Sequence, residues 1–318
     1  MQIIKIHHPY DKKMIPEEKV VLALGFFDGM HRGHQAVIQK AREIANAKGL
    51  ALAAMTFDHH ASVVFPKPQH RFSALSYLTS VSRKAELMEA TGVDILYVVN
   101  FTSAFGSLTP QEFVDQYMVG LNAEVVVAGF DYTFGPVATA NMDTLPEIAQ
   151  HRFEVVKVPK IIAQGQKIGS TAIRNAVADG EIDEANRYLG YPFETNGLVV
   201  HGEARGRTLG FPTANIVSNP NQITPGIGIY VVEIKIADKW YQGMASVGRN
   251  VVFGDGRPVT TEINILDFNQ EIYGETVRVK WHHRLRGEVK FASVDALIAQ
   301  LHQDEADTRA FLRSVKVV

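Results

Sequence analysis

The first half of the chain alternates short apolar runs with longer stretches in which apolar residues recur every three or four positions. Short apolar runs predict buried strands, and the longer period predicts helices that cover them. The predicted strands are Val20–Leu24, Leu50–Phe57, Ile95–Val99, Glu124–Ala128 and Phe153–Val158, and the predicted helices are Gly33–Lys48, Ser80–Thr91 and Thr109–Leu121. Because strands and helices alternate, we expect a parallel sheet covered by helices, which is an α/β fold.

The pattern changes at the Gly190–Phe193 turn, after two further helical stretches at Ser170–Asp179 and Ile182–Leu189. Beyond this turn, strand-like segments are separated by Gly, Pro and Asn turns. The predicted strands are Asn196–His201, Ile229–Ile236, Trp240–Val247, Thr260–Leu266 and Glu275–His282, and a helix is predicted from about Val294 to Leu312. We therefore expect an antiparallel barrel or sandwich with a helix packed on it. The predicted domains are residues 1–188 and 189–318.

Composition narrows the class of protein. The chain has 318 residues, of which 46% are hydrophobic and 21% are charged, as expected for two globular domains. The net charge of −2 provides no global cationic field, so we expect no nucleic-acid partner. There is no cysteine, no run of membrane-spanning length and no signal-peptide pattern at the N-terminus, so we expect a cytoplasmic protein without a membrane partner.

The segment Gly25-Phe-Phe-Asp-Gly-Met-His-Arg-Gly-His34 lies between the first predicted strand and the following helix. Its glycines, Gly25, Gly29 and Gly33, permit a tight turn that approaches a ligand closely. The start of the helix offers unpaired N–H groups and the positive end of a dipole, which favour phosphates. Two histidines near a turn can also be surface residues or zinc ligands. Their place between strand and helix favours hydrogen bonds from His31 and His34 to phosphate oxygens during a displacement.

This segment resembles the His-x-Gly-His signature of the nucleotidylyltransferase superfamily, and its longer form resembles the signature of prokaryotic bifunctional riboflavin kinase/FAD synthetases. The resemblance extends over nearly the whole chain and includes Met55–Asp58, Val127–Gly135 and Ile168–Arg174. It implies a Rossmann-like nucleotidylyltransferase domain followed by a riboflavin kinase barrel with a C-terminal helix. In the first site, the resemblance assigns ATP binding to Gly25, Phe27, Asp28, Gly29, Gly33, Asp131, Ser170, Thr171 and Arg174.

Each of these last four residues also has a simpler interpretation. Ser170 and Thr171 can cap the helix that follows, with Arg174 one turn further along, and Asp131 can be only a turn former. The chain also departs from the family pattern in three places. Gly169 replaces a second Ser, Phe57-Asp-His-His-Ala61 replaces Phe-x-Pro-His-Pro, and the uncharged Pro136–Asn141 replaces a basic stretch that contains Gly.

The second module begins with a Gly-rich run, Gly197–Asn215, that contains Arg205 and Arg207. Such a run can fold backbone amides around phosphates and add cationic donors. Thr213 and Asn215 stand two residues apart, so in an extended segment they lie on one face and can share a hard cation such as Mg²⁺. Taken alone, they can equally be solvated turn residues. The whole run resembles the signature of riboflavin kinases, and we assign ATP contacts to Gly202, Arg207 and Gly210.

Glu262 and Asn264 lie on one face of the predicted strand Thr260–Leu266. A carboxylate on such a face is often only solvated. In the resemblance Glu262 matches the catalytic base, which would deprotonate the riboflavin 5′-hydroxyl for attack on the γ-phosphorus. Phe253, Phe268 and Trp281 could flank a flavin ring, although aromatic residues of a small barrel more often belong to its core.

These observations predict an enzyme that phosphorylates riboflavin to FMN in the C-terminal barrel and adenylylates FMN to FAD in the N-terminal domain. The predicted catalytic residues are Glu262, His31 and His34, the metal ligands are Thr213 and Asn215, and the cofactor is Mg²⁺. Riboflavin, FMN and ATP are the expected substrates, and the oligomeric state is left open. Two alternatives remain: an adenylyltransferase acting on another acceptor, and a riboflavin kinase or flavin-binding protein whose N-terminal activity is weak or lost.

Overall fold

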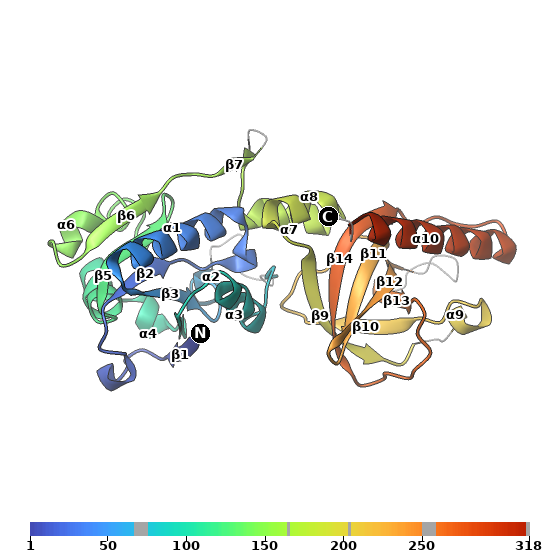
Figure 1. Cartoon of the computed structure of the whole chain (residues 1–318), viewed down its shortest axis with the longest axis horizontal. Coiled ribbons are helices and arrows are strands. Elements are labelled where there is room, and N and C mark those ends of the chain that lie inside the picture. The colour runs from blue at the N-terminus through green and yellow to red at the C-terminus, as the bar shows by residue number, and fades with distance from the viewer. Residues whose placement is uncertain (67–75, 164–165, 203–204, 250–258, 316–318) are drawn as a thin grey trace. The chain divides into compact units, whose positions relative to one another are not determined.

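A computed structural model describes residues 1–66, 76–163, 166–202, 205–249 and 259–315. The chain divides into two compact units. The first comprises residues 1–75 and 79–169, and the second comprises residues 76–78 and 170–318 (Figure 1). Each unit is described separately below.

The first unit is built on a six-stranded sheet in the order β1-β4-β3-β2-β5-β6, and every neighbouring pair is parallel. Its strands are β1 Gln2–Ile6, β2 Val20–Leu24, β3 Ala51–Phe57, β4 Ile95–Val99, β5 Ala123–Gly129 and β6 Glu154–Val158. A short hairpin, β7 Ile162–Ala163 and β8 Gln166–Lys167, follows the sheet. The predicted parallel sheet is therefore confirmed.

Helices cover both faces of this sheet. One face packs on α1 Arg32–Lys48 and α3 Val81–Ala90 through alternate strand residues such as Val21 and Ala23. The opposite face contacts a layer built from α4 Ser103–Gly106, α5 Pro110–Val114, the π-helical turn η4 Asp115–Val119 and α6 Leu145–Ala149. The remaining helical segments are η1 Lys12–Met14, η2 Asp28–Met30 and α2 Ala61–Val64. Because both faces are buried, the central strands are uniformly apolar, as the sequence indicated.

The order of the strands defines where a ligand can bind. From β2 the chain proceeds to β3 and β4 on one side, whereas β5 and β6 lie on the other side. In open α/β sheets, ligands bind outside the carboxyl ends of the strands at the point where the direction of winding reverses. In this unit that point lies between the ends of β2 and β5, which are followed by the Gly25–His34 and Phe130–Gly135 segments.

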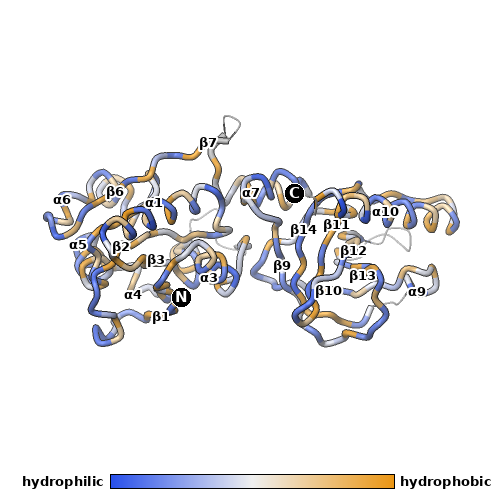
Figure 2. Tube along the Cα trace, in the orientation of Figure 1, coloured by the Kyte–Doolittle hydropathy of each residue, from blue (hydrophilic) through white to orange (hydrophobic). Residues whose placement is uncertain are grey.

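The second unit contains a closed antiparallel barrel in the order β10-β13-β12-β11-β14-β9. Its strands are β9 Phe193–Val200, β10 Ala214–Ser218, β11 Gly228–Ile236, β12 Lys239–Gly248, β13 Thr260–Ile265 and β14 Thr276–Arg286. The helices are α7 Ser170–Ala178, α8 Ile182–Leu189, the short α9 Arg205–Thr208 and α10 Val294–Val315. Hydrophilic and hydrophobic residues alternate along α10, which contacts β11, β12 and β14 (Figure 2). Of the two sequence-based alternatives, the barrel is confirmed.

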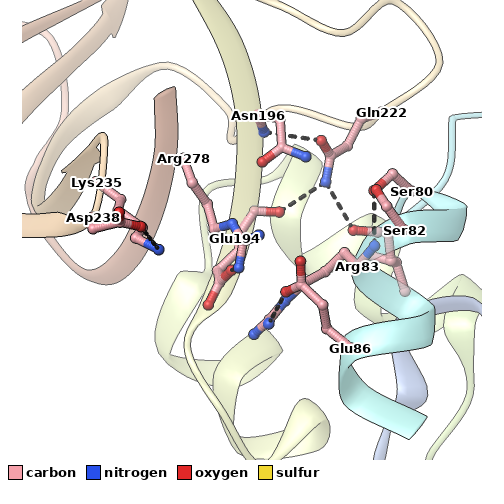
Figure 3. A network of polar contacts seen from close by, with 11 residues as sticks. Ser80, Ser82, Arg83, Glu86, Glu194, Asn196, Gln222, Lys235, Asp238 and Arg278 are labelled. Atoms are coloured by element: carbon pink, nitrogen blue, oxygen red, sulfur yellow. Dashed lines mark hydrogen bonds and ion pairs between the residues drawn. The ribbon is translucent and has the colours of Figure 1, made fainter. Parts of the chain in front are cut away.

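Gln222 organises the polar interior of this unit (Figure 3). Its side-chain Oε1 accepts a hydrogen bond from the Asn196 backbone N–H at 3.1 Å, and its Nε2 donates to the carbonyl oxygens of Glu194 at 2.8 Å and Leu78 at 3.1 Å. Residues 76–78, which precede α3 in the chain, are therefore held by hydrogen bonds within the second unit.

Four strands escaped the sequence analysis: β1, β10 and the two-residue strands β7 and β8. β1 is an edge strand with three exposed residues, so its sequence Gln-Ile-Ile-Lys-Ile is not a uniformly apolar run. β10 is short and has a single buried residue, Ile216. The division into units falls after Gly169, whereas the boundary at 188/189 stays a prediction from the sequence.

Candidate active sites

The loop between β2 and α1 adopts an unusual backbone conformation. Phe27 and Gly29 have φ angles of 56° and 76°, in the left-handed region. Gly29 adopts this region without the steric cost that a Cβ imposes. The buried ring of Phe27 packs edge-on against His34, with 5.3 Å between ring centroids. The loop therefore turns sharply from the sheet into α1, whose first turn lies at the switch point and begins with N–H groups that the helix itself does not pair.

His31 and His34 form a stacked pair at the start of α1. Their ring centroids lie 3.6 Å apart with an interplanar angle of 18°. His31 is the N-cap residue, and its Nδ1 accepts a hydrogen bond from the His34 backbone N–H at 3.3 Å. In neutral His31 the proton is therefore on Nε2, and this nitrogen is the donor.

His34 is held in its neutral form. Burial, the neighbouring His31 and the Lys84 ammonium together keep its pKa well below the usual range. Its Nδ1 is buried and has no hydrogen-bond partner among the described residues. A buried polar atom without a partner is costly, so this nitrogen is suited to a ligand. His34 thus offers a neutral imidazole beside the N-cap residue His31, at a helix N-terminus of the kind that binds phosphates.

Two glycines of the loop are required by close approaches. A Cβ on Gly25 would lie 2.9 Å from the ring of Phe27, and a Cβ on Gly33 would lie 3.1 Å from Cε1 of His31. A side chain at position 33 would therefore displace the imidazole of His31.

Asp28 helps to fix the loop through a hydrogen bond to Thr79. Its buried carboxylate accepts a hydrogen bond from the Thr79 backbone N–H at 3.2 Å, and the Gly29 N–H donates to Thr79 Oγ1 at 3.0 Å. Phe27 and Asp28, both assigned to ATP binding from the sequence, thus have side chains that shape the loop.

Asp131 follows β5 at the same edge of the sheet. Its side chain is exposed, and the Tyr132 N–H closes the turn on the Gly129 carbonyl oxygen at 3.0 Å. A Cβ on Gly129 would lie 3.3 Å from Asp131 Oδ1 and 3.9 Å from Val37 of α1. The structure therefore brings Asp131 and the start of α1 to the same switch point.

The segment that departs from Phe-x-Pro-His-Pro follows β3. Asp58 accepts hydrogen bonds from the His59 backbone N–H at 2.8 Å, the Phe101 N–H at 3.0 Å and Asn100 Nδ2 at 2.5 Å. Burial raises the pKa of Asp58, but these hydrogen bonds outweigh burial and hold the pKa below its usual value. A proline at position 59 would lack the N–H that His59 donates. The departure therefore provides a donor to a carboxylate that stays ionised.

An aromatic cluster lies beside this segment and was missed from the sequence. Phe101 contacts Phe57, Phe105 and Phe65 with ring centroids 5.4, 5.2 and 6.5 Å apart, and Phe65 is 49% exposed. The four residues are scattered over three segments, so no local pattern could have indicated that they meet. Lys84 of α3 was also missed, because the pattern of an amphipathic helix gives no signal that its lysine is buried.

Ser170, Thr171 and Arg174 lie in α7, the first helix of the second unit. Arg174 Nη2 donates to Thr171 Oγ1 at 3.3 Å. Since α7 begins at Ser170, the N-cap position falls on Gly169, not on Ser170 or Thr171. A Cβ on Gly169 would meet nothing within 4 Å. No neighbouring atom would therefore clash with a side chain at position 169.

In the barrel, Thr213, Asn215 and Glu262 come together. Asn215 of β10 is paired directly with Glu262 of β13, so their side chains lie on one face. Thr213 Oγ1 donates to Glu262 Oε2 at 3.2 Å. On the same face of β13, Asn264 is buried and its Nδ2 donates to the Pro212 carbonyl oxygen at 2.7 Å. Asn264 therefore fixes the backbone that leads into Thr213.

The preceding Gly-rich run approaches this cluster. A Cβ on Gly202 would lie 2.1 Å from Asn215 Nδ2, and a Cβ on Gly206 would lie 2.2 Å from the Phe211 carbonyl oxygen. Gly210 has a φ of 81°. Arg207 is exposed on α9; the side chain of Arg205 and the whole of Phe253 lie outside the described residues. The run thus lies over the carboxamide of Asn215.

The aromatic candidates of the barrel can now be placed. Trp281 is 1% exposed and donates from Nε1 to Thr195 Oγ1 at 2.9 Å, so it belongs to the core and cannot flank a flavin ring. Phe268 packs edge-on against Tyr241 with ring centroids 4.9 Å apart.

The donor atoms of the barrel cluster are of the kind that a hard cation binds. Its donors are a hydroxyl, a carboxamide oxygen and a carboxylate, which are oxygen ligands of the kind that Mg²⁺ prefers. Among the described residues, no group of three or more His, Asp or Glu side chains could hold a metal. A cation held by Thr213 and Asn215 would therefore take its further ligands from phosphate oxygens and water.

Comparisons with known proteins agree with this division into two sites. Residues 13–172 match the FAD synthetase family model and residues 189–312 match the riboflavin kinase model. The fold and both sites thus define a fusion of a nucleotidylyltransferase with a kinase barrel.

The relatives identify the family. The chain is 48% identical to a bifunctional riboflavin kinase/FMN adenylyltransferase of Listeria monocytogenes and 38% identical to one of Bacillus subtilis, covering 99% of this chain and 100% of each relative. The chain belongs to the family of bifunctional riboflavin kinase/FMN adenylyltransferases. A solved structure from Streptococcus pneumoniae, named as a macrolide-efflux protein, is 40% identical, with a TM-score of 0.85 over 97% of this chain and 99% of that one. In the part of this chain that the structure describes, no helix is long and apolar enough to cross a membrane.

Proposed function

We propose that this protein phosphorylates riboflavin to FMN in its barrel and transfers AMP from a second ATP to FMN in its first unit, giving FAD and pyrophosphate. The observation that carries the proposal is that each unit contains its own cluster of polar side chains suited to bind phosphates. One is the His31–His34 pair at the start of α1. The other is the hydrogen-bonded cluster of Thr213, Asn215 and Glu262.

In the kinase step, Glu262 acts as the general base. It accepts the proton of the riboflavin 5′-hydroxyl, whose oxygen forms a bond to the γ-phosphorus of ATP while the bond to the β,γ-bridging oxygen breaks and ADP leaves. Thr213 and Asn215 would hold Mg²⁺, and the ion would supply positive charge that offsets the charge of the phosphates. The hydrogen bond from Thr213 orients the carboxylate of Glu262. Gly202, Arg207 and Gly210 belong to the run that covers the nucleotide.

In the adenylyl step, a phosphate oxygen of FMN attacks the α-phosphorus of ATP and pyrophosphate leaves. This nucleophile is already ionised near neutral pH, so the step needs positioning and charge stabilisation more than a base. His31 and His34 donate hydrogen bonds to the oxygens on which charge develops, and the N-terminus of α1 adds its dipole. Gly25, Gly29 and Gly33 allow the close approach of the phosphates.

Three further contributions are proposed for the same step. Asp131 contacts the nucleotide from the β5 side of the switch point. The exposed ring of Phe65, supported by Phe101, offers a face on which a flavin ring can stack. The sequence resemblance also assigns a role to Ser170, Thr171 and Arg174, which substitution of each residue can test.

A second candidate function is a riboflavin kinase or flavin-binding protein with a weak first unit. It is favoured by Gly169 and by the uncharged Pro136–Asn141 segment, where the family pattern has Ser and basic residues. We further propose a cytoplasmic location, which the absence of cysteine supports, with no nucleic-acid or membrane partner.

The purified protein, incubated with riboflavin, ATP and Mg²⁺, should form FMN first and FAD later, as resolved by chromatography over time. A parallel reaction that starts from FMN should form FAD without a lag. FMN without FAD would favour the second candidate. No product from either flavin would contradict both transferase activities.

A further inference from the structure

Lys84 is a lysine buried beneath the phosphate loop of the first unit. It lies on α3 and is 2% exposed. Its Nζ donates to the Phe26 carbonyl oxygen at 2.7 Å and to Thr56 Oγ1 at 3.1 Å, and it lies 4.3 Å from the centre of the Phe26 ring. Thr56 Oγ1 also donates to the same carbonyl oxygen at 2.8 Å. One ammonium therefore joins α3, the end of β3 and the loop that begins after β2.

The charged groups around Lys84 come from three other elements. Asp28 of η2 and Asp58 at the end of β3 favour its protonated form, and His34 of α1 is near enough for the ammonium to lower the pKa of its imidazole. Burial nevertheless dominates and lowers the pKa of Lys84 to about 8. Burying this charge costs free energy. An unbranched apolar side chain of similar length would avoid that cost, yet the fold keeps a cation at this position.

We propose that Lys84 is a positioning residue of the adenylyltransferase site, which holds the Gly25–Gly29 turn in place for the triphosphate and adds a buried positive charge beneath it. The inference rests on the proposed adenylyl transfer in the first unit. Lys84 does not touch the substrates. It fixes the carbonyl oxygen of Phe26, one residue after Gly25, and so determines where the N–H groups and imidazoles of the loop point. Its charge acts on the anionic phosphates through a protein interior of low dielectric.

The alkaline pH range provides a readout that a merely structural side chain would not give. Lys84 loses its proton near pH 8, so its charge is present below that pH and absent above it. Adenylyl transfer should therefore decline relative to riboflavin phosphorylation as the pH rises from about 7 to about 10. The kinase of the same chain is the internal control, since the hydrogen bonds of Lys84 are to Phe26 and Thr56 of the first unit.

The contribution of Lys84 to stability changes with pH in the direction opposite to its contribution to activity. Between about pH 8 and the unperturbed lysine value of about 10.5, the unfolded chain binds a proton that the folded chain does not, so the lysine's contribution to stability rises with pH. Lys84→Met removes the penalty for burying the charge. At pH 7 this variant should melt at or above the wild-type temperature, and the difference should shrink as the pH rises.

The test compares wild type, Lys84→Met, Lys84→Arg and the control Lys40→Met, each in the full chain. Lys40 is a half-exposed lysine of α1 whose nearest carboxylate, on Glu43, lies 3.8 Å away. Lys84→Met should lower kcat/KM for FAD formation from FMN at pH 7 by roughly tenfold or more, because a charged hydrogen bond to the loop is lost. It should also abolish the alkaline decline, whereas riboflavin phosphorylation stays unchanged. Lys84→Arg should restore part of the activity and keep it above pH 9.

Several outcomes would overturn the inference. Wild-type kcat/KM in Lys84→Met would do so, as would an alkaline decline that persists in this variant. If Lys84→Met melts below wild type, the Lys84→Arg variant is the deciding test. FAD formation by Lys84→Arg that persists above pH 9 supports the inference. FAD formation that declines with pH as in wild type contradicts it. Failure of the wild type itself to make FAD from FMN would instead contradict the proposed function.

Discussion

The two units meet the same substrate, the triphosphate of ATP, with different chemistry. In the first unit the proposed groups are the imidazoles of His31 and His34 and the N–H groups at the start of α1, at the switch point of a parallel sheet. In the barrel they are oxygen atoms on two paired strands, including the carboxylate of Glu262. The difference follows from the nucleophile. An alcohol has to lose a proton as it attacks, whereas the phosphate of FMN is already ionised.

The buried charges differ in the same sense. The first unit keeps a cation, Lys84, beneath its phosphate loop, and this cation helps to keep His34 neutral. In the barrel cluster the described acidic side chain is Glu262, beside two neutral oxygen donors. A site that carries its own carboxylate repels phosphates unless a cation offsets its charge, whereas a site of donors and a buried lysine already favours anions.

The largest expected effect comes from replacing the proposed general base, Glu262, which should impair one activity and leave the other intact. Glu262→Gln should lower riboflavin phosphorylation by roughly 10²- to 10⁴-fold, because the amide cannot accept the proton of the 5′-hydroxyl. FAD formation from FMN should stay within about twofold of wild type. Rates of FMN and FAD formation, each measured from its own flavin, check this. Glu275→Gln, at an exposed carboxylate before β14, is the control. Equal loss of both activities would show that the two sites are not independent.

The reverse experiment removes a donor from the first site. His34→Ala should lower adenylyl transfer by roughly 10²- to 10³-fold, as for the loss of one hydrogen bond to a developing charge. Riboflavin phosphorylation should be unaffected. His7→Ala, at an exposed histidine of the same unit, should change neither rate. An adenylyl rate in His34→Ala equal to that of wild type would remove the imidazole from the proposed chemistry.

A matched pair of glycine substitutions tests how closely each loop fits its site. Gly33→Ala places a Cβ 3.1 Å from Cε1 of His31, and Gly202→Ala places one 2.1 Å from Nδ2 of Asn215. Each should displace its neighbouring side chain and lower only its own activity, by roughly tenfold to a hundredfold. We expect the larger loss in Gly202→Ala because the overlap is greater. Gly49→Ala, whose Cβ would meet nothing within 4 Å, controls for loss of stability at a glycine of the first unit. Crossed losses, with Gly33→Ala impairing the kinase, would contradict the assignment of the loops.

How much the sequence could predict differs between the two sites. Uniformly apolar strands and the glycines around His31 and His34 indicated both the parallel sheet and the phosphate loop, because burial on two faces and a tight turn leave local marks. In the barrel, Thr213 and Asn215 were predicted because their spacing suits a shared cation and because the run that contains them resembles the riboflavin kinase signature. Their pairing with Glu262, 47 residues further along the chain than Asn215, is a long-range contact that no local period records.

The residues that support the first site were beyond prediction for the same reason. Lys84 stands in an amphipathic helix beside Arg83, and the sequence gives no sign of which of the two side chains is buried. Phe65 and Phe101 meet only after two segments fold against each other. Asp28 stands within the motif, yet its side chain is turned toward Thr79 because the backbone takes left-handed angles at Phe27 and Gly29.

The smallest expected effect concerns Gly169, the departure from the family pattern at the start of α7. A Cβ there meets nothing within 4 Å, and position 169 is the N-cap of the helix. Serine is a better N-cap than glycine, so Gly169→Ser should raise the free energy of unfolding by a few tenths of a kcal/mol, as measured by denaturant titration. Adenylyl transfer should stay the same or rise by about twofold if the added hydroxyl reaches the triphosphate. Gly169→Ala, which lacks the hydroxyl, separates the gain in capping from the change in backbone freedom. A marked loss of FAD formation in Gly169→Ser would mean that the backbone at position 169 needs a conformation that glycine adopts and serine does not.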